Sequence, residues 1–220
     1  MTPRSRAIGF VALLAGVFMP LSMAIEIPKY RVLEQEGAYE LREYSPYLLA
    51  ETEVEAGFMN AGNIAFGRLF RYISGANSAQ TEIAMTAPVE QRGRGEGEKI
   101  AMTAPVEQSR GEGVYRVGFV VPSKYTRDTV PKPLDPRVSI REVGARKVAV
   151  WRYSGRWTEE NFREYEQQLR QILLRKKLQA DGGDSAIIAR YDAPFIPWFM
   201  RRNEVLIPLL EPPAVAKPAP

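Results

Sequence analysis

The 220-residue chain contains no cysteine and no histidine. The lack of cysteine excludes disulfide bonds, thiolate nucleophiles and sulfur-ligated metal sites. The lack of histidine excludes a serine–histidine catalytic pair, histidine-bound zinc and a proximal-histidine heme. Catalysis and metal binding that depend on cysteine or histidine are therefore closed to this chain.

A strong charge of one sign is also missing. The chain has 30 basic and 26 acidic residues, and basic residues do not form a stripe with interleaved aromatics. The sequence therefore does not favour a nucleic-acid partner. A hydrophobic content of 45% and a charged content of 25% are ordinary for a soluble globular protein. The length suits one sizeable domain, or at most two small ones.

The longest apolar run, residues 8–21, is about 14 residues long and falls short of the roughly 20 that a bilayer-spanning helix needs. Arg4 and Arg6 precede the run, and the small residues of Ser22-Met23-Ala24 follow it. This pattern predicts an export signal over residues 1–24, cleaved near Ala24, and a soluble periplasmic protein. The alternative is an uncleaved membrane anchor. The Pro/Ala-rich tail, residues 211–220, is predicted to be disordered.

One segment occurs twice. Ile83-Ala84-Met85-Thr86-Ala87-Pro88-Val89-Glu90-Gln91 recurs as residues 100–108, and a glycine-rich stretch separates the copies. Two β-favouring runs around a glycine turn predict a hairpin, with Pro88 and Pro105 at an edge or a strand end. Either the duplication only lengthens a hairpin, or Met85 and Met102 line a ligand groove, because methionine side chains are soft and adaptable.

Hydrophobic periodicity predicts two similar halves. The first contains strands at 39–44, 47–54 and 114–121 and a helix at 58–73. The second contains strands at 138–143, 146–153, 186–191 and 203–209 and a helix from about Thr158, a suitable N-cap, to Gln179. The connection 123–136 is predicted to be irregular. In the first helix, Phe66 and Phe70 continue the apolar stripe and are predicted to face the core.

An offset of 99 residues aligns the halves without gaps. Leu41-Arg42-Glu43 falls on Ile140-Arg141-Glu142, and Phe66 and Phe70 fall on Tyr165 and Leu169. The alignment predicts a duplicated strand–strand–helix–strand unit, with repeats at about 38–121 and 138–209 inside one domain, 25–210. Two such units predict an α+β fold: a distorted antiparallel sheet or barrel with two helices packed outside.

Four motifs together resemble the SOUL / heme-binding protein family. They are the doubled Ile-Ala-Met-Thr-Ala-Pro-Val, Val120-Val121-Pro122-Ser123-Lys124-Tyr125, Pro131-Lys132-Pro133-Leu134-Asp135-Pro136 and Arg201-Arg202-Asn203-Glu204-Val205. The resemblance runs from about Tyr30 to Leu209. It implies the same duplicated fold and a tetrapyrrole ligand in an apolar groove.

The resemblance places basic residues of the first helix beside the groove, here Arg68 and Arg71. Guanidinium groups suit propionates because they offer paired donors and stay charged. The alternative is that both arginines form the solvent face of the helix. The other candidates for the groove wall are Tyr72, Met85, Met102, Trp198 and Phe199. For Trp198 and Phe199 the alternative is a role in anchoring the core.

These observations predict an exported, non-catalytic protein that carries or buffers heme or another porphyrin without a histidine ligand. A heme would take another axial ligand, or none from the protein. The rival is an envelope module that binds another apolar small molecule, or a protein or membrane surface. A third interpretation, a hydrolytic or dechelating enzyme, needs carboxylates with perturbed pKa values facing the groove.

Overall fold

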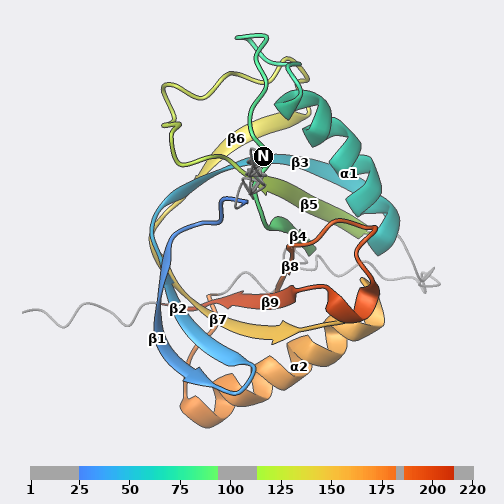
Figure 1. Cartoon of the computed structure of the whole chain (residues 1–220). Helices are drawn as coiled ribbons and strands as arrows, with labels where there is room; N and C mark the ends of the chain where they lie inside the picture. The colour runs from blue at the N-terminus through green and yellow to red at the C-terminus, as the bar shows by residue number, and fades with distance from the viewer. Residues whose placement is uncertain (1–24, 94–112, 182–185, 211–220) are drawn as a thin grey trace, which may run out of the picture.

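A nine-stranded antiparallel sheet with two helices forms the protein (Figure 1). The computed structural model describes residues 25–93, 113–181 and 186–210. The predicted signal segment 1–24, the tail 211–220 and Met102 lie outside the described residues. No helix within the described ranges is long and apolar enough to cross a membrane. Every described helix and strand lies between Tyr30 and Pro208, so this part carries the whole sheet.

The elements follow the predicted order, with β1 as an additional strand. They are β1 Tyr30–Glu36, β2 Tyr39–Tyr44, β3 Tyr47–Ala56, α1 Phe58–Ile73, β4 Val89–Gly93, β5 Gly113–Val120, β6 Val138–Val143, β7 Arg146–Tyr153, α2 Glu159–Lys176, β8 Ile187–Arg190, the 3-10 helix η1 Trp198–Met200 and β9 Asn203–Pro208.

The two halves are related by an approximate two-fold. The strand order is β1-β2-β7-β9-β8-β4-β5-β3-β6. The counterparts in the two halves are β2 and β6, β3 and β7, β4 and β8, and β5 and β9. If each strand is replaced by its counterpart, the stretch from β2 to β6 reads as the same order in reverse. The first strand of each half pairs with the second strand of the other half. The registers agree, because the pair Tyr44–Arg146 becomes Val143–Tyr47 under the offset of 99. The repeat is therefore ββαββ, with one strand more than the predicted unit.

The prediction that the two copies of the doubled segment form a hairpin is wrong for the first copy. Its strand β4 pairs with β5 on one side and with β8 on the other. The second copy, residues 100–108, lies outside the described residues. Pro88 directly precedes β4, at a strand end as predicted. Residues 83–88 form no strand; the hydroxyl of Thr86 instead donates to the carbonyl of Val120.

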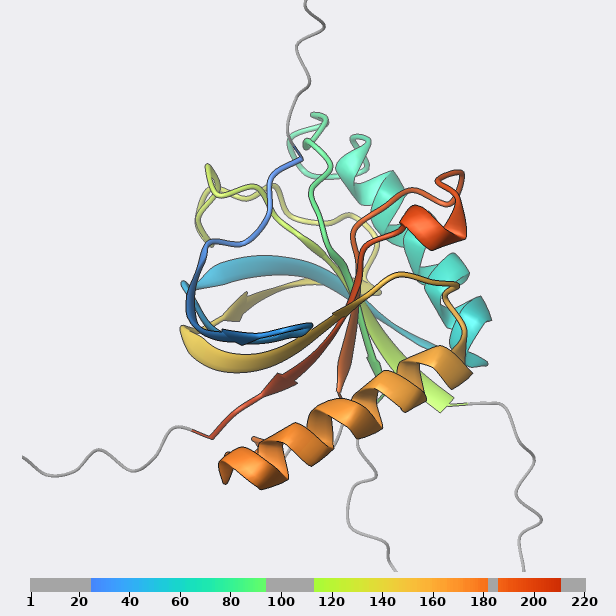
Figure 2. The same ribbon diagram turned by 60° about the horizontal axis from the view of Figure 1, so that its bottom comes forward.

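Each helix covers its own half of the same sheet face (Figure 2). The core under α1 is built on β3 and β5, and the core under α2 on β7 and β9. Helix α2 begins as predicted, since the Thr158 side chain accepts from the Asn161 amide. It ends at Lys176, because Lys177 adopts the left-handed conformation with φ 55°. The end is thus earlier than Gln179.

The prediction that Phe66 and Phe70 face the core is wrong, because both side chains are substantially exposed. The buried side of α1 instead runs through Ala61, Ala65 and Leu69. Two alanines in successive turns let the helix approach the sheet closely, which turns the phenylalanines to one flank.

Candidate functional site

The exposed flank of α1 presents a flat aromatic surface. The rings of Phe66 and Phe70 stack with centroids 5.8 Å apart and an interplanar angle of 11°. Phe66 is 38% exposed and Phe70 47% exposed, and the other side of Phe66 contacts the edge of Phe119 on β5 at 5.4 Å. Met59, about two helical turns before Phe66, is exposed as well. This α1 flank (Met59, Phe66 and Phe70) is apolar but unburied, which is uncommon for stacked rings in a small domain.

The segment 83–88 runs beside the C-terminal part of α1 (Figure 2). The amide of Ile83 donates to the carbonyl of Ile73 over 2.7 Å, and the Ile83 side chain packs into the core under α1. Met85, two residues further on, is exposed. The sequence-predicted Met85 therefore lies on a segment anchored to the end of the helix that carries the aromatic pair.

The two predicted arginines point in different directions. Arg68 donates through Nη1 to Thr52 Oγ1 at 3.3 Å and to the carbonyl of Glu53 at 2.9 Å, which draws it toward β3. Arg71 lies exposed in the last turn of α1 and forms no ion pair with any described residue. Arg71 is thus the arginine of this pair that is available to an anion.

Tyr72 lies in the core. It is almost completely buried, and its hydroxyl donates to the carbonyl of Pro131 over 2.8 Å. Burial raises the pKa of Tyr72 to about 12. Tyr72 therefore ties the irregular connection 122–136 to α1 and does not form a wall of an exposed groove.

Trp198 and Phe199 belong to a loop that stands beside α1 in both views (Figures 1 and 2). Their rings meet edge to face at 5.6 Å, and both side chains are about half exposed or more. The alternative that they anchor the core is wrong for this reason. The described site residues that the sequence predicted thus lie in three places: Tyr72 in the core, Arg68, Arg71 and Met85 on or beside α1, and Trp198 and Phe199 in this loop.

A buried ion cluster on the opposite face of the sheet escaped the sequence analysis. Arg42 donates through Nη1 and Nη2 to the two carboxylate oxygens of Glu204 at 2.8 and 2.9 Å, and through Nε to Glu40 at 2.7 Å. Arg42 and Glu204 are both 0% exposed. Burial alone would raise the pKa of Glu204, but the hydrogen bonds and charge of Arg42 lower it below its usual value. Glu40 and Arg42 occupy alternate positions of β2, a pattern typical of the solvent-facing side of a strand. The sequence therefore did not indicate that these charges are buried.

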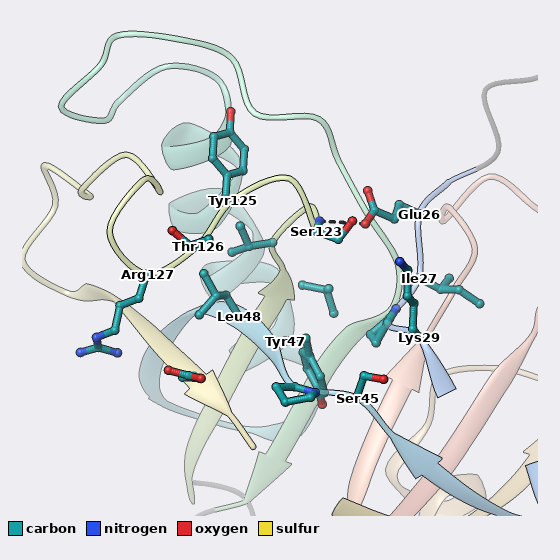
Figure 3. Close-up of a pocket in the computed structure, with 15 residues that line it drawn as sticks. Glu26, Ile27, Lys29, Ser45, Tyr47, Leu48, Ser123, Tyr125, Thr126 and Arg127 are labelled. Atoms are coloured by element: carbon teal, nitrogen blue, oxygen red, sulfur yellow. Dashed lines mark hydrogen bonds between the residues drawn. The ribbon is translucent and has the colours of Figure 1, made fainter. Parts of the chain in front are cut away.

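A pocket of about 360 Å³ lies among residues that exclude the aromatic pair of α1 (Figure 3). The N-terminal segment, the β2–β3 turn and the loop after β5 line it, with Tyr47 and Leu48 at its wall. Glu26 accepts from the Ser123 amide at 2.8 Å, and the hydrogen bonding to Ser123 lowers the pKa of Glu26. None of the predicted site residues that the structure describes lines this pocket.

The described residues contain no group of three or more acidic side chains arranged to hold a metal ion. The buried carboxylates all have partners: Arg42 for Glu40 and Glu204, Arg141 for Glu51, and the hydroxyl of Tyr47 for Glu90.

A sequence model described as SOUL heme-binding protein matches residues 25–208. The chain is similar to Heme-binding protein 2 of Homo sapiens, with 30% identity over 194 residues, covering 84% of this chain and 86% of that protein.

Two solved structures share the fold at low sequence identity. The C-terminal domain of EcmrR has a TM-score of 0.57 and 10% identity, covering 83% of this chain and 98% of that chain. A protein described as a hydrolase from Listeria innocua has a TM-score of 0.53 and 10% identity, covering 81% and 94%.

Proposed function

The chain belongs to the SOUL heme-binding protein family, and we propose that it binds heme or a related tetrapyrrole on the α1 flank, as a carrier or buffer. The observation that carries this proposal is the stacked, exposed pair Phe66 and Phe70. A soluble domain leaves such a surface uncovered when a flat apolar partner is to occupy it. The name of the human relative supports the same ligand class.

The residues around α1 suit a tetrapyrrole held without histidine. Phe66 and Phe70 offer parallel rings for the macrocycle, and Arg71 offers a guanidinium group for a propionate. Met59 and Met85 expose thioethers, which could ligate a heme iron. Heme, when bound, would supply an iron centre for redox chemistry or ligand exchange, while these residues hold the ring and its acid groups.

Carriage rather than catalysis fits the state of the acidic side chains. A general acid or base needs a carboxylate with a pKa near the working pH, which usually means a raised value. The pKa of Glu204 is lowered instead, and Arg42 holds it in a bidentate pair. The resemblance to a protein described as a hydrolase rests on 10% identity and supports the shared fold alone.

We further propose that the protein is exported and works in the periplasm. The support is the sequence pattern of residues 1–24. Expression of the full chain followed by N-terminal sequencing of the mature protein checks this. An N-terminus near Ile25 in the periplasmic fraction is expected, and an intact Met1 in the cytosol contradicts export.

Titration of the purified protein with hemin tests the binding proposal. We expect a saturable Soret shift that ends at one equivalent. The double variant Phe66→Ala/Phe70→Ala should bind about tenfold more weakly or worse, because it removes two large apolar contacts. Arg71→Gln should weaken binding less, since one exposed charge contributes about 1 kcal/mol or less.

The matched control lies on the other helix. Leu174 is a large exposed side chain on α2, and Arg175 is an exposed arginine beside it. Leu174→Ala and Arg175→Gln should leave the titration unchanged. Unsaturable binding by the wild type, or equal affinity in the Phe66/Phe70 variant, would reject the proposal. Native mass spectrometry that finds a lipid mass instead of a porphyrin mass would favour the rival apolar ligand.

A further inference from the structure

The loop 194–200 exposes more apolar surface than any other short stretch of the described chain. Four of its five large apolar side chains are exposed, Phe195 by 85%, Trp198 by 49%, Phe199 by 60% and Met200 by 66%, and Ile196 is half-buried. The loop stands out from the sheet beside α1 in both views (Figures 1 and 2). Four such side chains on one projecting loop are costly in water unless a partner covers them.

The loop holds these side chains in place. Arg201 donates through Nε to the carbonyl of Ile196 at 2.7 Å and through Nη2 to the carbonyl of Pro194 at 2.5 Å. The 3-10 turn of η1 and the edge-to-face contact of Trp198 and Phe199 fix the far side. The surface is therefore largely preorganised, which lowers the entropy cost of docking.

Arginines without acidic partners surround the loop. Arg156 lies over the ring of Trp198 at 5.6 Å, and Arg201 lies over the ring of Trp157 at 4.3 Å. Arg190 is placed between Phe58 and Trp157, at 5.6 and 5.4 Å from the two rings. None of these three arginines forms an ion pair within the described part of the chain.

The two halves differ in charge at the position of Arg190. Its counterpart under the offset of 99 is Gln91, and the two side chains are hydrogen bonded at 3.1 Å. Burial lowers the pKa of Arg190 to about 10, so its positive charge is held at a cost. At these equivalent positions the second half thus carries a cation, Arg190, and the first half a neutral amide, Gln91.

We propose that the surface formed by Phe195, Trp198, Phe199, Met200, Arg156 and Arg201 docks on an anionic lipid bilayer. Aromatic side chains favour the interface between headgroups and acyl chains, and nearby arginines attract anionic headgroups. A second copy of the chain is a poor occupant, because a symmetric contact would bring the unpaired arginines of both copies together. The membrane proposal does not depend on tetrapyrrole binding at α1.

Vesicle sedimentation of residues 25–220, which contain every described helix and strand, tests the proposal. We expect binding to phosphatidylcholine vesicles with about a quarter of phosphatidylglycerol, weak binding to pure phosphatidylcholine, and release by high salt. Trp198→Ala/Phe199→Ala should reduce the partition coefficient about tenfold or more. Arg156→Gln, an exposed residue, should reduce it about fivefold.

Controls separate this surface from general stickiness and from the tetrapyrrole site. Leu174→Ala, Arg175→Gln and Phe66→Ala/Phe70→Ala should bind vesicles like the wild type, and circular dichroism should show that every variant is folded. The proposal is overturned if the anionic vesicles do not bind the wild type, or if Trp198→Ala/Phe199→Ala binds unchanged. A concentration-dependent dimer that this variant abolishes would also overturn it, by showing that a second copy covers the loop.

Discussion

The two helices occupy equivalent places in a duplicated fold but present different surfaces. Phe70 on α1 is 47% exposed, whereas its counterpart Leu169 on α2 is completely buried. Phe66 lies on the exposed flank, whereas its counterpart Tyr165 stacks on Tyr153 at 4.2 Å. The same backbone thus exposes these side chains in the first half and packs them in the second.

The equivalent arginines differ in the same sense. Arg42 in β2 is completely buried and bidentate to Glu204, whereas Arg141 in β6 keeps a side chain 31% exposed beside Glu51. Stability therefore depends more on the polar cluster around Arg42. Changes that act on one half or the other should separate the two halves, and four comparisons follow from the largest effect to the smallest.

Glu204→Gln should destabilise the protein by about 3 to 5 kcal/mol, because it removes the bidentate carboxylate partner of the fully buried Arg42 and leaves that residue only its contact with Glu40. Glu51→Gln should cost about 1 kcal/mol, since water reaches Arg141. Urea unfolding of both variants measures the difference. Equal losses would show that the two polar clusters contribute alike.

Leu169→Ala should cost about 3 kcal/mol through a cavity under α2. Phe70→Ala at the matched position should cost less than about 1 kcal/mol, because water already reaches the ring. Thermal unfolding compares the two. A large loss for Phe70→Ala would mean that the ring supports the fold, and would weaken its assignment to binding.

Acid should destabilise the second half through Glu204. The pKa of Glu204 is lowered in the folded protein, so its ionised form contributes stability above the unfolded value of 4.5, and this contribution is lost as pH falls through the folded value. Unfolding free energy measured at decreasing pH should fall more steeply for the wild type than for Glu204→Gln. Parallel curves would mean that Arg42 does not lower the pKa of Glu204 in the folded protein.

The smallest contrast concerns two buried tyrosine hydroxyls. Tyr72→Phe should cost about 1 kcal/mol, because it removes the hydrogen bond to Pro131. Tyr153→Phe should change stability little, since the Tyr153 hydroxyl has no hydrogen-bond partner among the described residues. Chemical unfolding of both variants tests the pair, and a larger loss for Tyr153→Phe would reverse the expected order.

Much of the fold could be predicted because its signals are local. Alternation and turn residues gave β2, β6 and β7 their observed bounds, and apolar periodicity with Gly75 gave those of α1. The strand β1 was missed, because it is exposed along most of its length and shows no alternation.

The candidate site was harder to predict than the fold. In α1 the stripe through Phe66 and Phe70 and the stripe through Ala65 and Leu69 have the same spacing, and only the distance to the sheet decides which is buried. Burial of Arg42 depends on Glu204, which is 162 residues away in sequence. Tertiary packing determines which face of α1 is buried and which distant residue pairs with Arg42, and neither can be read from local sequence.

The central claim, that α1 binds a tetrapyrrole and α2 does not, is tested most directly by amide NMR during a hemin titration. The account predicts that signals from residues 59–74 and from Met85 shift or broaden up to one equivalent, while those of residues 159–176 stay unchanged. Changes centred on α2, or spread evenly over both helices, would contradict it.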